Sequence, residues 1–359
     1  MGSGPRGPLP IDTTQTIGET MLTFIGKRLF QALFVLFGLS LLIFFIARVM
    51  PGDPARAALG HLATSEQVEK LREEMHLNDP FPVQYYYWLR NLMHGDLGRS
   101  SYTRRPVTQD LLQYLPATFE LILFATLISA VVGQLTGVLA GFFRNSWFDG
   151  LSRLVSYLGI ATPSFVVAIL LLFVFSQVLR LAPGVGRLPI MMTPPPVITG
   201  FMTIDGLLAG QPDVTLTALR HMVLPAVSLS VIHIAQEGRI TRTSIVENMQ
   251  KDYITVHKVH GIRTPRLLFK YLLKPSIIPT VTVMGLDFAF LMSNAFLVEM
   301  VYMWPGFSRY AVTAMLNKDL NAIVAVVLVI GLTFAMVNLL VDIIIMGLDP
   351  TVRLRREGG

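Results

Sequence analysis

The sequence contains six long apolar runs, and these constrain its fold more than any other feature. An α-helix needs about 20 apolar residues to cross the hydrocarbon core of a bilayer. Each run has roughly this length and is bounded by proline, glycine or charged residues. Because lipid offers no partner for backbone N–H and C=O groups, such runs predict helices. We therefore predict an all-α, polytopic membrane protein with about six transmembrane helices, at 29–49, 117–143, 154–179, 219–235, 276–298 and 322–348.

The composition supports a membrane protein and excludes several kinds of site. Hydrophobic residues make up 52% of the 359 residues and charged ones only 14%, and the mean hydropathy of +0.57 is too high for an ordinary soluble domain. The absence of cysteine excludes disulfides, thiolate metal sites and cysteine nucleophiles. His221 and His233 lie too far apart along the fourth run to form a ligand pair on one helix turn, so we expect no metal site.

The positive charge of the chain indicates its orientation in the membrane. The pI is about 9.6, but the basic residues lie in short connections and form no patch with interleaved aromatics, so we expect no nucleic-acid partner. Cytoplasmic loops carry an excess of Lys and Arg. With six spans, the basic clusters fall on one side and both termini are cytoplasmic; the clusters are Lys27 and Arg28, Arg144 and Arg153, the segment from Arg239 to Lys274, and Arg353, Arg355 and Arg356.

The segments around the runs suggest one membrane domain. Residues 1–23 are rich in Gly, Pro and Thr, and we expect them to be disordered or a non-native leader. We assign residues 24–355 to the membrane domain and 356–359 to a tail. Within the domain, 51–116 is expected to be an extracytoplasmic loop and 239–274 a cytoplasmic one.

Two patterns in the outer loops predict local structure. The stretch TSEQVEKLREEMHL begins with the Thr64-x-x-Gln67 spacing of a capping box and places apolar residues on one helix face, which predicts a short amphipathic helix. Trp304-Pro305-Gly306 follows the fifth run. We expect Trp304 to lie at headgroup depth, where Trp is enriched, and Pro-Gly to end the helix.

A basic, polar segment separates the fourth and fifth runs, QKDYITVHKVHGIRTPRLLFKYLLKPSIIP at 250–279. The stretch from Tyr253 to His260 contains no helix breaker, Gly261 is placed to end a helix, and Pro265 to begin the next turn. Leu267, Leu268, Tyr271 and Leu272 then form an apolar face that we expect at the membrane interface. Spacing alone leaves two interpretations open, an anchor that fixes topology and a short helix that a cytoplasmic partner grips.

This segment resembles the cytoplasmic loop of ABC importer permeases, in which a helix before a glycine docks into the ATP-binding subunit. The general form of that loop is Glu-Ala-Ala, three residues, Gly and a later Leu-Pro. Gly261 keeps the glycine, whereas Thr255, Val256 and His257 replace Glu-Ala-Ala and Pro279 follows later than usual. The stretches DYITVHKVHGI and SIIP are closer to the branch that imports dipeptides, oligopeptides and nickel. Other stretches resemble that branch in order, namely RVMPGDPARAALG, HGDLGRSS, LPATFELILFAT, TGFMTIDGLLAGQPD, LRHMVLPAVSLS, VEMVYMWPGFSRY and NLLVDIIIMGLDPTVR.

The resemblance implies a fold, a function and partners. The fold would be the transmembrane domain of a type I ABC importer, in the inner (plasma) membrane of a prokaryote. The function would be import of di- or oligopeptides, with nickel or another small solute, or a stand-alone transporter or channel, as alternatives. The implied partners are a second homologous permease, two cytoplasmic ATP-binding subunits that bind ATP and Mg, and an extracytoplasmic solute-binding protein. The residues implied to couple to the ATPase are Tyr253, Ile254, Thr255, Val256, His257, Lys258, His260 and Gly261.

The chain lacks the motifs of an enzyme that would act by itself. It contains no Gly-x-x-x-x-Gly-Lys-Ser/Thr phosphate loop, no Gly-x-Ser-x-Gly elbow and no His-Glu-x-x-His pair. We therefore expect no ATP hydrolysis by this chain and no cofactor bound to it. A membrane-embedded enzyme remains the weaker hypothesis.

One ionisable residue lies deep in an apolar run. Asp287 falls in the fifth run, and Asn294 lies two helical turns further on the same face. Ionisable groups within a membrane are costly and are candidates for function. Asp287 and Asn294 are therefore candidates to line the transport pathway; the favoured alternative is a buried carboxylate satisfied by a neighbouring helix or by the second permease. Glu299 and Asp342 lie nearer helix ends, and we expect them to form structural hydrogen bonds.

Overall fold

The computed structural model describes residues 13–49, 54–59, 63–74 and 76–348, and within these ranges every regular element is a helix. Five helices are long and apolar enough to cross a membrane, and one bent pair forms a sixth candidate. The prediction of an all-α polytopic membrane protein is thus confirmed. The five long helices are α1 (Thr13–Val49), α5 (Val107–Phe142), α9 (Pro212–Met249), α12 (Leu273–Asn294) and α15 (Leu320–Leu348).

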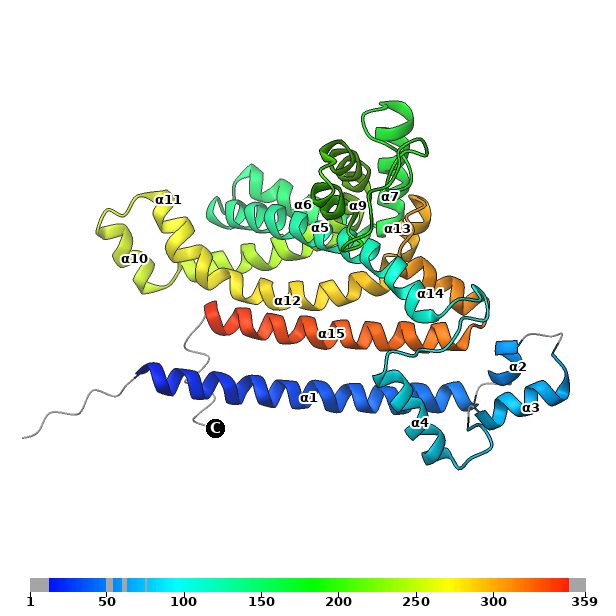
Figure 1. The fold of residues 1–359 in the computed structure, drawn as a ribbon. Coiled ribbons are helices and arrows are strands. Elements are labelled where there is room, and N and C mark those ends of the chain that lie inside the picture. Colours follow the sequence, from blue (N-terminus) through cyan, green and yellow to red (C-terminus); the bar gives the residue numbers. More distant parts are fainter. Residues whose placement is uncertain (1–12, 50–53, 60–62, 75, 349–359) are drawn as a thin grey trace, which may run out of the picture.

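The first and last spanning helices lie side by side (Figure 1). Arg28 Nε near the start of α1 lies 3.0 Å from Asp342 Oδ2 near the end of α15, so the two helices run antiparallel, and Asp342 has the structural role expected of it. Helix α1 begins at Thr13, so residues 13–23, which we expected to be disordered, are helical. Residues 1–12 and the basic tail at 353–356 lie outside the described residues.

The third span is broken, which corrects the prediction of one helix over 154–179. Helix α6 (Trp147–Ala161) and α7 (Ser164–Leu171), which continues as a π-helical stretch to Val178, meet at an angle of 104°. The break follows from Pro163, because a residue before proline is driven out of the helical region. Thr162 accordingly has φ −95° and ψ 119°.

The fourth span is much longer than the predicted 219–235. Helix α9 continues through Pro225 and through the polar stretch after Ala235 as far as Met249. Pro225 is buried, and its lost hydrogen bond does not stop the helix because neighbouring helices pack around it. The polar residues beyond Ala235 are accommodated because several of them are buried against partners on α5, α6 and α12. The fourth span therefore leads without interruption towards the polar segment at 250–279.

The first outer loop contains three short helices. Helix α3 (Ser65–Glu74) is the predicted amphipathic helix, and its capping box is present, since Gln67 N donates to Thr64 Oγ1 and Thr64 N to Gln67 Oε1. The sequence analysis missed α2 (Pro54–Leu59) and α4 (Phe81–Met93). The aromatic side chains of α4 pack edge-on against the outer half of α1, where Phe44 is the central ring.

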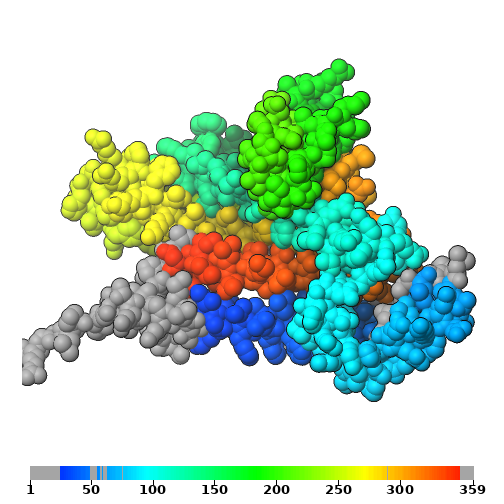
Figure 2. Space-filling view, viewed as in Figure 1, coloured from blue at the N-terminus to red at the C-terminus, as the bar shows by residue number. Residues whose placement is uncertain are grey.

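A hub of buried aromatic residues holds the outer end of the bundle together. Trp304 is only 1% exposed, which corrects the expectation that it lies at headgroup depth. Its Nε1 donates to Ala117 O on α5, and the Arg187 guanidinium lies over its ring. Short helices α13 (Phe296–Val301) and α14 (Phe307–Leu316) flank it. The segment with α7 and α8 (Met202–Leu208), green in Figure 2, stands out from the bundle as a lobe at this end.

Candidate functional site

The segment predicted to couple to a cytoplasmic partner is a short helix joined directly to a spanning helix. Helix α10 (Asp252–Val259) follows the end of α9 after only Gln250 and Lys251. Gly261 has φ +70°, the left-handed conformation that favours glycine, so it ends this helix as predicted. Pro265 lies in the first turn of α11 (Thr264–Arg266), also as predicted. Figure 1 shows α10 and α11 at the end of the molecule opposite α2, α3 and α14.

The inner face of α10 is fixed by apolar packing. Ile254 is fully buried in a cluster with Ile245 of α9 and Val138 of α5. Leu267, Leu268 and Leu272 belong to this cluster. They therefore support α10 and do not face the membrane interface, which corrects that expectation. A fully buried Ile side chain stabilises such packing by roughly 1.5–3 kcal/mol relative to exposure.

The outer face of α10 is open. Thr255, Val256 and Lys258 are exposed, as are His260 and Gly261. At the edge, the His257 ring lies 4.0 Å from that of Tyr271, and burial raises the pKa of the Tyr253 phenol. Seven of the eight predicted coupling residues thus lie on or beside one accessible face, and Ile254 is the anchor beneath it.

A buried ion pair attaches α6 to α9 close to this segment. Arg242 donates from Nε to Asp149 Oδ1 at 2.5 Å and from Nη2 to Oδ2 at 2.8 Å, a bidentate arrangement. Asp149 has no exposed surface and also accepts from Asn145 N, while its own N–H donates to Ser146 Oγ. The start of α6 is therefore tied to α9 ten residues before α10 begins.

A glycine stripe brings α5 against the same helix. Gly133, Gly137 and Gly141 recur every four residues on α5 and face α9. A methyl group added at Gly137 would lie 2.6 Å from Gly238 O and 2.7 Å from Thr241 Cβ, distances that no side chain tolerates. Small residues at such spacing allow two membrane helices to approach closely. Movement of α10 would thus carry α9, α5 and the start of α6 together.

The predicted pathway residues do not share one environment. Asp287 on α12 is 15% exposed, and its Oδ2 lies 3.2 Å from Nδ1 of the buried His233 on α9. Asn294 is exposed and donates its amide to Phe290 O on its own helix. The structure therefore places a neighbouring-helix group at ion-pair distance from Asp287, although Asp287 Oδ2 and His233 Nδ1 form no hydrogen bond. The role of both residues in a pathway stays a prediction.

Sequence reasoning missed several of these residues. Arg242 was counted only among the basic residues of the segment at 239–274 and Asp149 was not singled out, because nothing in the sequence links residues so far apart in the chain. The repeat Gly133-x₃-Gly137-x₃-Gly141 was a readable signal for a close helix contact. So was the four-residue spacing of His233 and Glu237, which places both on one face of α9.

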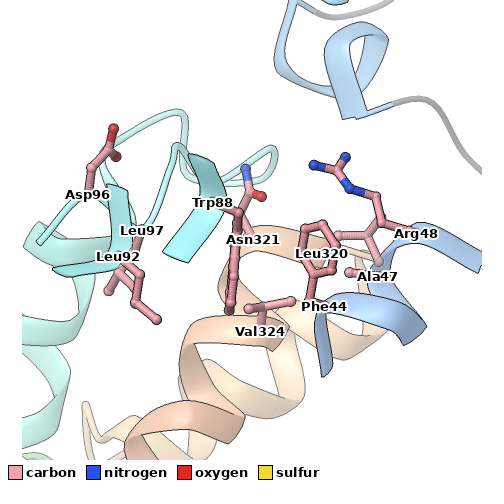
Figure 3. Close-up of a pocket in the computed structure, with 10 residues that line it drawn as sticks. All are labelled: Phe44, Ala47, Arg48, Trp88, Leu92, Asp96, Leu97, Leu320, Asn321 and Val324. Atoms are coloured by element: carbon pink, nitrogen blue, oxygen red, sulfur yellow. The ribbon is translucent and has the colours of Figure 1, made fainter. Parts of the chain in front are cut away.

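The molecule also has a cavity far from this segment, and it does not belong to the candidate site. A cavity of about 80 Å³ lies between α1, α4 and α15 at the outer end. Figure 3 shows Arg48 and Asp96 on opposite sides of it, with Trp88 and Asn321 between them. In the part of the chain that the structure describes, no three His, Asp or Glu side chains are grouped to hold a metal.

Comparison with known families adds to this geometry. Residues 133–354 match the family model described as binding-protein-dependent transport system inner membrane component, and residues 21–122 match the model of the N-terminal part of such components. This chain belongs to that family. It is therefore a multi-pass membrane protein and a permease component of a transport system.

Curated relatives in the family cover nearly the whole chain. The probable D,D-dipeptide transport system permease protein DdpB of Escherichia coli is 35% identical over 95% of this chain and 99% of its own length. The dipeptide transport system permease protein DppB of Alkalihalophilus pseudofirmus is 34% identical over 93% of this chain and all of its own. The glutathione transport system permease protein GsiC of Pectobacterium atrosepticum is 32% identical over the same share. The resemblance stated from sequence motifs is thus confirmed.

Proposed function

We propose that this chain is one of two membrane subunits of an ATP-driven importer of short peptides, in the inner membrane of a prokaryote. The observation that carries this proposal is the open face of α10, which is fixed to α9 by the packing of Ile254 and by a connection of only two residues. The names of the relatives support a peptide as the substrate, since they are permeases for D,D-dipeptides, dipeptides and glutathione. Nickel or another small solute finds no support among these names.

The proposed partners follow from the family. A second permease would complete the pathway, two ATPase subunits would bind ATP and Mg and grip α10 from the cytoplasm, and a solute-binding protein would deliver the peptide outside. This chain would bind no nucleotide and would hydrolyse no ATP itself. Shifting a two-state equilibrium from 1:99 to 99:1 requires about 5.5 kcal/mol of differential binding. Closure of the ATPases and docking of the loaded binding protein would supply it.

Movement would pass along rigid connections. A displacement of α10 moves the continuous helix α9, since only two residues separate them. Helix α5 follows because the glycine contact leaves no room for independent sliding, and α6 follows through Asp149 and Arg242. The bend at Thr162 and Pro163 then lies between moving α6 and α7, whose Ala168 O accepts from Tyr302 of the outer hub. The spans would thereby tip between inward- and outward-facing states.

The test is reconstitution of the chain with the two ATPases, the second permease and the binding protein in liposomes. We expect peptide uptake to require ATP inside the vesicles and the binding protein outside. Gly261→Pro, which cannot adopt φ +70°, should abolish uptake while ATP hydrolysis continues. Gly150→Ala on α6, where an added methyl meets nothing within 4 Å, is the control and should transport normally. Uptake by the chain alone, driven by an ion gradient, would contradict the proposal and favour an autonomous transporter.

A further inference from the structure

A polar seam runs along the contact between α9 and α12. His233 on α9 meets Asp287 on α12 at 3.2 Å, and eight residues further along α9 the Thr241 hydroxyl meets that of Thr280 at 2.9 Å. Glu237 lies midway between these two points, four residues from each, so it projects from the same side of α9. The seam thus places a glutamate between two fixed contacts within the membrane domain.

The carboxyl group of Glu237 is buried and only half satisfied. The residue is 1% exposed. Its Oε1 accepts from the Ser129 hydroxyl of α5 at 3.0 Å, whereas its Oε2 has no hydrogen-bond partner. Within the described ranges, no Lys, Arg or His nitrogen lies at ion-pair distance from either oxygen.

The charged groups on the surrounding helices do not neutralise it. Helix α5 carries no ionisable residue between 121 and 142. Helix α12 carries Asp287, a second acidic group, and Lys274, which is exposed and lies beyond the contact of Thr241 with Thr280. On α9 itself, His233 lies against Asp287, Arg239 is exposed and Arg242 is bound to Asp149 of α6. Arg153 of α6 is also near Asp149. The His233 imidazole therefore lies at ion-pair distance from Asp287 and not from Glu237.

A buried carboxylate without a cation is costly, by several kcal/mol even after relaxation. Proton uptake is the change that removes this cost without any further space, since Glu237 COO⁻ and H⁺ give COOH. We propose that Glu237 is a proton-binding site, occupied in the conformation described here and linked to the position of α12 through Asp287. The proton lies on Oε2, the oxygen without a partner. Ionisable groups in the membrane interior that adjoin one another are the elements from which proton relays are built.

Proton binding at Glu237 and the position of α12 must influence each other reciprocally. Asp287 contacts α9 at His233, one helical turn from Glu237, and two neighbouring carboxylates repel each other, so separation of α12 from α9 would allow the proton to leave more easily. A bound proton accordingly favours the packed arrangement of the two helices. This part rests on the proposed function, because alternating access is what would move α12, whereas the bound proton itself does not depend on transport.

The test is infrared spectroscopy of the full chain, purified with its partner subunits, near neutral pH. A protonated carboxylic acid gives a carbonyl-stretch band that carboxylates lack. We expect Glu237→Gln to lose one such band, and Glu247→Gln, altered at an exposed position of the same helix, to keep it. Glu299→Gln identifies any contribution of the other fully buried glutamate. If Glu237→Gln does not fold, wild-type chain carrying ¹³C-glutamate should show the band displaced by the isotope.

Three outcomes decide the proposal. Absence of the band from wild type, or its persistence in Glu237→Gln, would overturn proton binding. Loss of the band on adding sodium at constant pH would show a metal cation in place of the proton and would also overturn it. Asp287→Asn should make the band disappear at a pH lower by on the order of one unit; an unchanged midpoint would overturn the link to α12. None of these readouts requires uptake, so they remain decisive even if the proposed substrate is wrong.

Discussion

At the scale of single residues, the membrane domain depends on glycines at helix contacts, which lack a Cβ atom, and on buried glutamates, whose energetic cost depends on protonation. The glycines of α5 allow its backbone to touch α9, and a fully buried glutamate, Glu299, holds the outer hub. Glu299 accepts hydrogen bonds from the Thr118 hydroxyl and from Arg309 N, and Thr118 in turn accepts from Phe307 N. Both features are local, so each gives a prediction for one substitution.

Gly137→Ala should destabilise the chain markedly. The added methyl would lie 2.6 Å from the Gly238 carbonyl oxygen, a backbone atom that cannot turn aside. We expect a loss of about 1–3 kcal/mol, as for other overpacked interiors, measured as a lower midpoint of thermal unfolding in detergent. Gly150→Ala, with nothing within 4 Å, should leave the midpoint unchanged or raise it. Equal effects of the two substitutions would show that α5 and α9 are not in close contact.

Glu299 should make stability depend on pH near neutrality. Burial raises the pKa of Glu299 to about 7, although hydrogen bonds from Thr118 and Arg309 N oppose it. Because the folded pKa is above the unfolded one, its contribution is fully present below the unfolded value of 4.5 and is lost as pH rises through about 7. Glu299→Gln should therefore match wild type at low pH and be more stable above pH 7.

The size of this effect is about 3 kcal/mol, at 1.36 kcal/mol for each unit of pKa difference between 4.5 and about 7. Thermal unfolding of wild type and Glu299→Gln across that pH range measures it, with Glu247→Gln as the exposed control. A constant difference at every pH would indicate that Glu299 keeps one protonation state throughout.

At the scale of elements, α9 is the helix that connects the outer end of the molecule to the end that carries α10. It begins beside the outer lobe, runs unbroken to Met249 and is followed by α10. Its contacts differ along its length: backbone contact with the glycines of α5, polar contacts with α12 and an ion pair with α6. Each connection can be broken separately.

Arg242→Ala should cost more than Asp149→Asn combined with Arg242→Gln. The single substitution removes the bidentate partner of the fully buried Asp149 and leaves only Arg153, whose Nε lies 3.7 Å from Oδ1; breaking a buried pair typically costs about 3–5 kcal/mol. The double substitution removes both charges and leaves groups that can still form hydrogen bonds. Thermal unfolding of wild type, Asp149→Asn, Arg242→Gln and the double variant measures the coupling energy, with Arg242→Ala measured beside them. Additive effects would show that the pair contributes no stability of its own.

Ile254→Ala and Val256→Ala should separate the support of α10 from its outer face. Ile254 is fully buried, so its truncation should cost about 2–4 kcal/mol and loosen α10 from α9. Val256 is 51% exposed and should tolerate alanine with a change within about 0.5 kcal/mol. If the face binds an ATPase, Val256→Asp should lower uptake at unchanged stability. Normal uptake by Val256→Asp would exclude this part of the face from the contact.

At the scale of the whole molecule, the helices separate two ends. The basic segment with α10 and α11 lies at one end, together with the start of α1 and the end of α15, and the outer-loop helices lie at the other (Figure 1). This arrangement agrees with the charge distribution that predicted cytoplasmic termini.

Because the chain contains no cysteine, single cysteines can test this arrangement directly. Val256→Cys on α10 should react with a membrane-impermeant maleimide only from the cytoplasmic side. Met191→Cys in the outer loop, where Met191 is 97% exposed, should react only from the opposite side. Labelling of right-side-out and inverted membrane vesicles measures both. Reaction of both positions from the same side would contradict the six-span topology.

The sequence by itself determined the class of the fold, the family and the positions where some of the helices begin or end. Long apolar runs require helices wherever they occur in lipid, and a capping box or a Gly261 acts through neighbours a few residues away. These properties are local in the chain, so the pattern of residues was sufficient to predict them. For the same reason the pattern located the coupling segment, α10, to within one residue at each end.

Only the tertiary structure decided how the helices are connected. The extent of α9, the partners of Asp149 and Asp287, and the burial of Trp304 and Leu272 depend on groups distant in the sequence. A polar residue after an apolar run either marks the end of a helix or forms a buried contact within it. Which of the two occurs depends on whether another helix supplies a partner for its hydrogen bonds. That information resides in packing, which composition and spacing do not contain.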